Sequence, residues 1–200
     1  MSQVILQNKI QKDDTSLGAL VGKTITSASI PNGTTKIGKY SFAYCSALTD
    51  VTIPDSVTTI EESAFYYCTH LLSLSIPDSV SILGTTICYY CNRLANVTLS
   101  NNITEIGDMA FYRCDVLPSI IIPSSITSIG EQAFRNCYLL NNVTVNALTP
   151  PTLGYNPFGG TSENLVIYVP AESVDTYKAA SGWSSYASKI QAIPTWSLAI

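Results

Sequence analysis

The sequence predicts a repeat solenoid in which each unit forms a strand, a bend and a short helical segment. Three observations predict it: cysteine recurs every 23 residues, apolar residues recur in fixed phases around each cysteine, and the apolar spacing changes within each unit. A fixed period in the twenties is typical of units that stack and contact mainly their neighbours. The recurring cysteines are Cys45, Cys68, Cys91, Cys114 and Cys137.

The first half of each unit has the apolar pattern of a strand. Its second and third apolar phases are two residues apart, so these side chains point to one face and the residue between them points to the other. Proline follows in four of the six units, where its missing donor helps to end the strand. The three phases hold Ile25, Leu48, Leu71, Leu94, Leu117 and Leu140; Ala28, Val51, Leu74, Val97, Ile120 and Val143; and Ile30, Ile53, Ile76, Leu99, Ile122 and Val145.

The second half of each unit changes to helical spacing. Apolar residues then stand three to five apart, which predicts one face of a short helix or helical turn. In the second unit they are Val57, Ile60, Ala64, Phe65 and Cys68. A glycine follows the Ile/Leu slot in four units, and we interpret it as a backbone conformation that favours glycine. These glycines are Gly38, Gly84, Gly107 and Gly130.

The frame is clearest in residues 48–68, LTDVTIPDSVTTIEESAFYYC. It resembles the BspA-like, or treponemal-type, leucine-rich repeat over about residues 25–148. The resemblance implies a right-handed leucine-rich-repeat array of about six 23-residue units. In such an array, one parallel sheet lies on the concave side and short helical segments lie on the convex side. The third unit departs from the frame, because Ile87 and Cys88 exchange bulk between two neighbouring core slots.

The start of the chain is expected to cover the first repeat, since repeat arrays need polar or covered ends. We assign residues 1–24 to an N-terminal cap, with Val4 and Leu6 as strand contacts and Asp13-Asp14 in a loop. The repeats then occupy residues 25–148.

The other end is expected to close the array with a different motif. The sixth unit begins with Leu140, Val143 and Val145 and is expected to lose the repeat pattern from Thr149 onwards. Residues 149–193 then form a C-terminal cap of a strand plus a helix. The strand is expected at 165–170 and the helix at 171–180. The segment resembles the cap of BspA-like proteins, in which three residues would seal the last core layer. These residues are Tyr177, Trp183 and Ile190; a tail at 194–200 contains Trp196.

Composition excludes several functions. Charged residues make up 12% of the chain, the net charge is −4, and lysine and arginine form no run. Nucleic-acid binding is not expected, because it requires clustered cations to displace counterions. No apolar run reaches the roughly 18–20 residues that span a bilayer.

The first nine residues lack the apolar segment of about 7–15 residues that marks a secretory signal. We therefore expect either a mature fragment that begins with a new Met or a protein that leaves its cell without this signal. A virion protein released by lysis would fit the second case.

The cysteines are expected to be structural. Five of the six occupy one core phase beside phenylalanine, as a small buried hydrophobe does, which favours unbonded thiols over disulfide pairing. Cys88 and Cys91 imitate a CxxC motif, but they belong to different phases, and no second CxxC or nearby histidine completes a zinc set. We therefore predict no metal and no cofactor.

No group of residues points to catalysis. His70 is the only histidine, and it lies at a turn where we expect it to face solvent. Glu61 and Glu62 are adjacent on a bend, so their carboxylates diverge instead of converging on one bond. No glycine-rich phosphate cradle precedes a helix. We expect no enzymatic activity and assign no catalytic residue.

The strand face is the first candidate binding surface. Small polar residues stand between the core positions of each strand, and leucine-rich repeats generally use this concave face for recognition. An alternative is that these residues only keep an exposed sheet soluble. The candidate binding residues are Asp50, Thr52, Ser73, Ser75, Asn96 and Thr98.

Two tyrosine columns on the convex side form the second candidate surface. Because adjacent helical positions cannot both face the core, we expect at least one column to be substantially exposed. Tyrosine combines apolar area with a hydroxyl group, which suits weak protein or glycan contacts. Alternatively, the rings only shield neighbouring repeats. One column holds the candidate residues Tyr66, Tyr89 and Tyr112, and the other holds Tyr44, Tyr67 and Tyr90.

Three functions remain open at this point. The resemblance implies a cell-surface or secreted bacterial adhesion module that binds a host or bacterial surface protein or a glycan. The missing signal segment favours a receptor-binding or decoration protein of a bacteriophage particle. The third possibility is a structural spacer that presents another domain.

Overall fold

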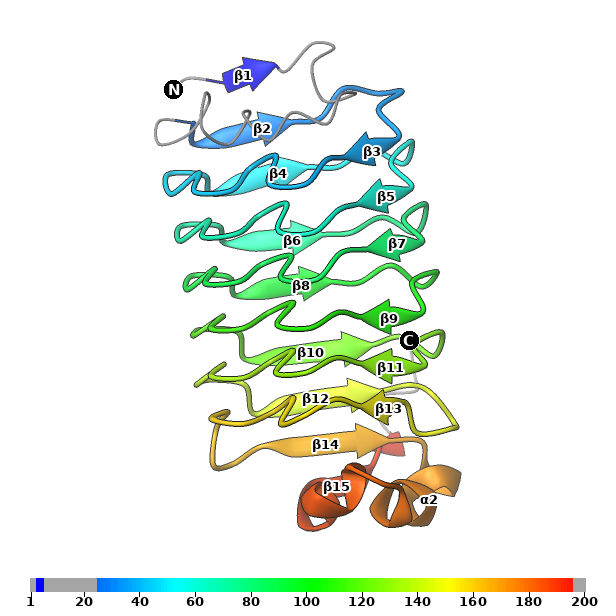
Figure 1. Ribbon diagram of the computed structural model, residues 1–200. Helices are drawn as coiled ribbons and strands as arrows, with labels where there is room; N and C mark the ends of the chain where they lie inside the picture. The colour runs from blue at the N-terminus through cyan, green and yellow to red at the C-terminus, as the bar shows by residue number, and fades with distance from the viewer. Residues whose placement is uncertain (1–2, 6–24, 196–200) are drawn as a thin grey trace.

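The chain forms a column of stacked coils with strands running across it (Figure 1). The computed structural model describes residues 3–5 and 25–195. Every strand pair is parallel, and the repeated coils pair at the 23-residue offset, as in Ala28 with Val51 and Leu74 with Val97. The predicted parallel repeat solenoid is confirmed. Leu6, Asp13-Asp14 and Trp196 lie outside the described residues.

The longer strands form one column along the stack. Hydrogen bonds join them in the orders β1-β2-β4, β6-β8 and β10-β12-β14-β15. The amide of Leu72 also donates to the carbonyl of Thr49 at 3.1 Å, which links the segments leading into β4 and β6. The strands are β1 (Gln3–Ile5), β2 (Ser27–Ser29), β4 (Asp50–Thr52), β6 (Ser73–Ser75), β8 (Asn96–Thr98), β10 (Ser119–Ile122), β12 (Asn142–Val145), β14 (Val166–Val169) and β15 (Ile190–Ala192).

A second column of two-residue strands follows the first corner of each coil, in addition to the single predicted sheet. These strands pair in the orders β3-β5-β7 and β13-β11-β9. Two residues are too few to display a period of two, so the pattern gave no strand signal here. The strands are β3 (Lys36–Ile37), β5 (Thr59–Ile60), β7 (Ile82–Leu83), β9 (Glu105–Ile106), β11 (Ser128–Ile129) and β13 (Thr152–Leu153).

The segments expected to be short helices are successive turns. Tyr66 and Cys68 donate to carbonyls three residues back, whereas Phe65 and Tyr67 donate to the next coil, to the carbonyls of Ile87 (3.0 Å) and Tyr89 (2.8 Å) respectively. Tyr67 has a positive φ of 58°, and equivalent residues in other coils share this conformation. Such a residue interrupts a right-handed helix and turns the neighbouring amide towards the adjacent coil.

The core runs through the whole stack. All six residues of the first apolar phase are buried, and Phe42 stacks on Phe65 with ring centroids 5.3 Å apart. Phe111 and Phe134 repeat this stack at the same distance. Between the two pairs, Ile87 and Cys88 are both fully buried, as the predicted exchange of bulk requires. Val97 and Ile53 are only partly buried and pack against this core.

The recurring glycines have a different cause from the one predicted. Gly84 is not among the described glycines with positive φ. A Cβ atom added there would collide with the backbone of Glu61 and Glu62 in the preceding coil. Gly107 and Gly130 meet the preceding coil in the same way. Glycine therefore allows two coils to approach closely, and its left-handed conformational freedom is not used.

The sixth unit continues further than predicted. Thr152 pairs with Ser128 at an offset of 24 residues, so one residue has been added after β12. The turn segment then resumes, and Phe158 stacks on Phe134 with ring centroids 5.7 Å apart. Asn156 and Gly160 have positive φ, as the equivalent residues of the other coils do.

The C-terminal residues cover the last coil. Strand β14 is followed by η2 (Ala171–Ser173), α2 (Val174–Ala179) and η3 (Trp183–Lys189), and β15 then returns to pair with β14. The Tyr177 hydroxyl donates to the carbonyl of Ala147 at 2.7 Å, and Trp183 Nε1 donates to the carbonyl of Pro151 at 2.6 Å. Tyr177, Trp183 and Ile190 are buried, as predicted.

The close approach at Gly84 predicts that Gly84→Ala lowers the free energy of unfolding by about 1–3 kcal/mol, the usual cost of overpacking. Gly38→Ala is the matched control, because its added Cβ meets only the Ser41 hydroxyl at 3.3 Å and the Glu61 carboxylate at 3.9 Å. Urea unfolding measures both variants. Equal stability of the two variants would show that the contact between coils is not the reason for glycine at position 84.

Candidate functional site

The strand face holds the predicted polar residues in a lattice. Ser73 pairs with Asn96 and Ser75 pairs with Thr98 across β6 and β8, and Asp50 and Thr52 occupy the equivalent positions of β4. The side chain between them points into the core in β4 and β6. Five of the six candidates are exposed, and Ser73 is half-buried. The structure therefore brings all six residues onto one face.

A shallow depression of about 670 Å³ opens where β4 and β6 end. Thr52 and Ser75 line it together with Asp55 and Asp78. The amide of Asn101 donates to Asp78 Oδ1 at 2.8 Å, and this hydrogen bond, joined by one from the Asn101 side chain, lowers the pKa of Asp78. The depression thus presents the hydroxyl groups of Thr52 and Ser75 beside the carboxyl groups of Asp55 and Asp78.

The strand face becomes more apolar towards the C-terminal end. Ile121 in β10 is 62% exposed and lies beside Thr144 of β12. Thr144 pairs in turn with Tyr168 of β14, which is half-buried. Tyr168 was not among the candidate residues that the sequence predicted for this face. The alternating pattern of Leu165-Val-Ile-Tyr-Val-Pro170 places it at an outward position.

The tyrosine columns form two adjacent ring stacks. Tyr66 and Tyr89 stack at 5.0 Å, Tyr89 and Tyr112 at 4.9 Å, and Tyr67 and Tyr90 at 4.7 Å. All five side chains are half-buried. Burial, with a smaller effect from the neighbouring phenols, raises the pKa of Tyr66 to about 12.

The expectation of a substantially exposed column is wrong for most of its length. Tyr44 alone among these six tyrosines is exposed, at 56%. The faces of the inner rings contact other rings, so the edges and hydroxyl groups remain available to a partner.

Arg113 continues the Tyr44-Tyr67-Tyr90 column as a flat cation. Its guanidinium carbon lies 5.2 Å from the centroid of the Tyr90 ring and 5.3 Å from that of Tyr138. Its Nε lies 3.4 Å from Asp115 Oδ1, and Asn92 Nδ2 donates to Asp115 Oδ2 at 2.8 Å. Sequence reasoning missed this cluster, although an arginine in a tyrosine phase was a visible signal.

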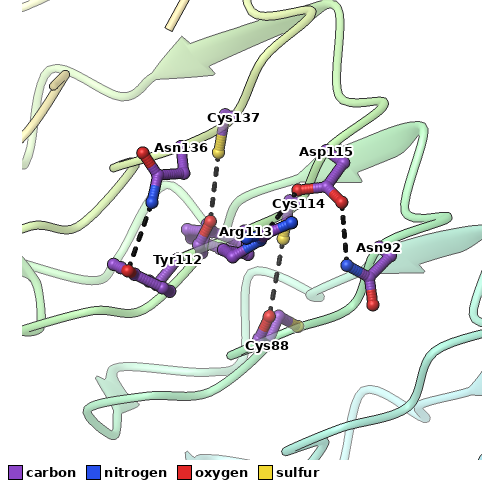
Figure 2. Close-up of polar contacts among 9 residues, drawn as sticks. Cys88, Asn92, Tyr112, Arg113, Cys114, Asp115, Asn136 and Cys137 are labelled. Carbon is purple, nitrogen blue, oxygen red and sulfur yellow. Dashed lines mark hydrogen bonds and ion pairs between the residues drawn. The ribbon is translucent and has the colours of Figure 1, made fainter. Parts of the chain in front are cut away.

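All six cysteines are buried and unpaired, and the five of the recurring phase form a ladder. Cys68, Cys91 and Cys137 each donate to a backbone carbonyl 26 residues earlier, at 3.0–3.2 Å. Cys114 bonds to the carbonyl of Cys88 at 3.4 Å in the same way (Figure 2). Burial raises the pKa of Cys45 to about 11. The predicted buried, unbonded ladder is confirmed.

The remaining sequence candidates do not assemble into a reactive group. His70 is exposed, and its Nδ1 lies 3.3 Å from the Thr69 hydroxyl. Glu61 and Glu62 bind different lysines, Lys36 and Lys39. Within residues 3–5 and 25–195, no three histidine, cysteine, aspartate or glutamate side chains gather closely enough to hold a metal ion. None of the helices described is long and apolar enough to cross a membrane.

These features define a leucine-rich-repeat solenoid. A family model for the BspA type leucine rich repeat region matches residues 18–141 in six copies, so the chain belongs to this family. It is a family of repeat scaffolds typical of bacterial surface proteins. A search of the curated proteins found no match.

Three solved leucine-rich repeat structures are similar to this chain to different degrees. A leucine-rich repeat protein of T. pallidum is 27% identical with a TM-score of 0.63, over 70% of this chain and 64% of that protein. A leucine rich cell surface protein of Faecalibacterium prausnitzii is 21% identical with a TM-score of 0.44, over 84% of this chain and 64% of that protein. A Bacteroides ovatus leucine-rich repeat protein is 20% identical with a TM-score of 0.36, over 72% and 55%. The chain therefore spans less than two thirds of each protein.

Burial of the cysteine ladder predicts six free thiols after denaturation and almost none that react in the folded chain. A thiol must reach solvent and ionise before it reacts, and burial prevents both. Titration with a chromogenic disulfide reagent measures this reactivity. Ser75→Cys is the positive control, because its thiol would be exposed on the strand face and should react at once. Thiols that appear only after dithiothreitol treatment would instead indicate disulfides.

Proposed function

We propose that the chain is a non-catalytic scaffold that binds a protein or a glycan through its strand face. We further propose that it serves in adhesion at a bacterial cell surface or as a secreted module. The observation that carries the proposal is the lattice of outward polar side chains on β4, β6 and β8. Parallel pairing holds β6 and β8 in register, and the hydrogen bond from Leu72 to Thr49 links the segments that lead into β4 and β6. Membership of a family typical of bacterial surface proteins supports the location.

Preorganisation is the physical reason for assigning binding to this face. Parallel strands place equivalent side chains about 4.8 Å apart, so a partner meets positions that are already fixed. Short side chains such as Thr52 and Ser75 have little conformational freedom to lose, which lowers the ordering cost of association. Many small contacts of this kind suit an extended protein segment or an oligosaccharide.

The depression beside the lattice supports the same assignment. Thr52 and Ser75 belong to the lattice and also line the depression, so a partner lying on the strands also reaches Asp55 and Asp78. Hydroxyl and carboxylate oxygens accept hydrogen bonds from sugar hydroxyl groups and from backbone or side-chain amides. The partner is accordingly expected to present hydrogen-bond donors at this point.

The ring stacks are a weaker candidate. A sugar stacks against the open face of an aromatic ring, yet the faces of Tyr67 and Tyr89 are covered by their neighbours. The stacks therefore contribute mainly to cohesion between coils. Tyr66, Tyr89 and Tyr112 remain an alternative site only through their edges and hydroxyl groups.

Replacing Thr52, Ser75 and Thr98 together by lysine should abolish binding while leaving the fold intact, because all three side chains are exposed. The control carries three lysines at Thr35, Ser81 and Thr104, which are exposed just before the second strand column. Binding to immobilised extracellular-matrix proteins and to a glycan array measures the effect, and thermal melts check the fold.

The control variant should bind as the wild-type chain does. Normal binding by the strand-face variant, together with loss of binding in the Tyr66, Tyr89 and Tyr112→Ser variant at unchanged stability, would move the site to the ring stacks. A wild-type chain that binds none of these surfaces would contradict the adhesion proposal.

A further inference from the structure

The strand face is bordered by two edges of opposite character. In Figure 1 the loops that follow β4, β6 and β8 lie at one edge of the stack, and the loops that lead into these strands lie at the opposite edge. We call the first set the post-strand edge and the second set the post-cysteine edge. The post-strand edge comprises residues 53–58, 76–81, 99–104, 122–127 and 145–151; the post-cysteine edge comprises residues 67–72, 90–95, 113–118 and 136–141.

The post-cysteine edge carries basic residues in its first two segments and exposed apolar residues in its last two. His70 and Arg93 are exposed in its first two segments, and Leu72 is also exposed there, at 49%. Val116 and Leu139 are exposed in the last two, Leu139 at 55%, and Tyr138 is exposed beside Leu139. Asp115 is the only carboxylate in these four segments, and Arg113 and Asn92 engage it. This edge therefore presents no free negative charge.

The post-strand edge is acidic and then apolar in the same direction. Asp55 and Asp78 line the depression of about 670 Å³ in its first two segments. A second depression of about 490 Å³ lies near its other end; Leu148, Pro150 and Pro151 give it an apolar part, and Ser124, Asn146 and Thr149 also line it. The five segments contain no lysine, arginine or histidine.

The two edges are complementary at the same level of the stack. His70 and Arg93 are separated by one repeat, and so are Asp55 and Asp78, because all four residues belong to the second and third coils. Leu139 ends the fifth coil, and the apolar depression joins the loops of the fifth and sixth coils. Since both edges have the coil spacing of about 4.8 Å, one alignment matches the two basic residues with the two aspartates and also matches the apolar groups with each other.

We propose that copies of this chain associate side by side, parallel and unstaggered, with the post-cysteine edge of one copy against the post-strand edge of the next. Arg93 then meets Asp78, His70 meets Asp55, and Leu139 enters the apolar depression. An antiparallel arrangement would place leucine against aspartate and is disfavoured. Because the two edges differ, the contact is heterologous: each copy uses one edge to bind its neighbour and keeps the other edge free. Association can therefore extend into rows. All strand faces in a row point the same way, and only the copy at the free post-strand edge leaves Asp55 and Asp78 open to the partner of the strand face.

A charge-swap series tests the pairing of Arg93 with Asp78. Sedimentation velocity of the full chain, up to about 1 mM, should show a mass that rises with concentration and falls at about 0.5 M salt. Arg93→Glu should weaken association at least about tenfold, since it sets two carboxylates against each other. Adding Asp78→Lys to Arg93→Glu should restore association. The control is Arg93→Glu with Asp175→Lys, which has the same net charge and places lysine on the exposed surface of α2.

The apolar contact has an independent test. Leu139→Asp should abolish association without lowering the melting temperature, because the side chain is 55% exposed. A wild-type chain that stays monomeric throughout the concentration range would overturn the proposal. Equal rescue by Asp78→Lys and Asp175→Lys would overturn the unstaggered pairing, as would failure of Asp78→Lys to rescue while the fold is intact.

Discussion

The stacking of each coil on the next, at an offset of 23 residues, is the constraint on which the rest of the structure depends. The amides of Phe65 and Tyr67 donate to Ile87 and Tyr89, and Gly84 donates to the carbonyl of Ile60 at 2.8 Å. These bonds leave little freedom for one coil to slide against another. Each side chain consequently meets its own equivalent one repeat away, which produces the phenylalanine, cysteine and tyrosine ladders.

The same constraint explains which features the sequence could predict. Buried phases and the cysteine ladder follow from side-chain character, which a repeat displays directly, whereas the sealing roles of Tyr177 and Trp183 came from the resemblance to the cap of BspA-like proteins. The turn segments do not, because alternate amides bond to a neighbouring coil and override the helical spacing of Ala64, Phe65 and Cys68. The prediction for the glycines was wrong for a similar reason, because glycine is required at Gly84 by the close backbone of Glu61 and Glu62 in another coil.

The proposed binding surface consists of side chains that stacking leaves exposed. The inner tyrosine ring faces are covered by neighbouring rings, and the cysteines are buried in the core. Most outward side chains of β4, β6 and β8 remain exposed. The lattice residues were predictable because they stand between apolar phases. The depression beside them and the Arg113 cluster were not, since both depend on side chains that several coils bring together. The two edges follow the same logic, because their charges become complementary only when coils are aligned.

Native-state hydrogen exchange tests the stacking constraint most directly. If amides of the turn segments bond to the next coil, those of Ser63, Phe65 and Tyr67 exchange slowly and at rates close to those of the strand amides in the same coils. Exchange should become fast only when the whole stack opens. Fast exchange at Phe65 and Tyr67 alongside slow exchange in β4 and β6 would contradict the account, because the turn segments would then be held by the core alone.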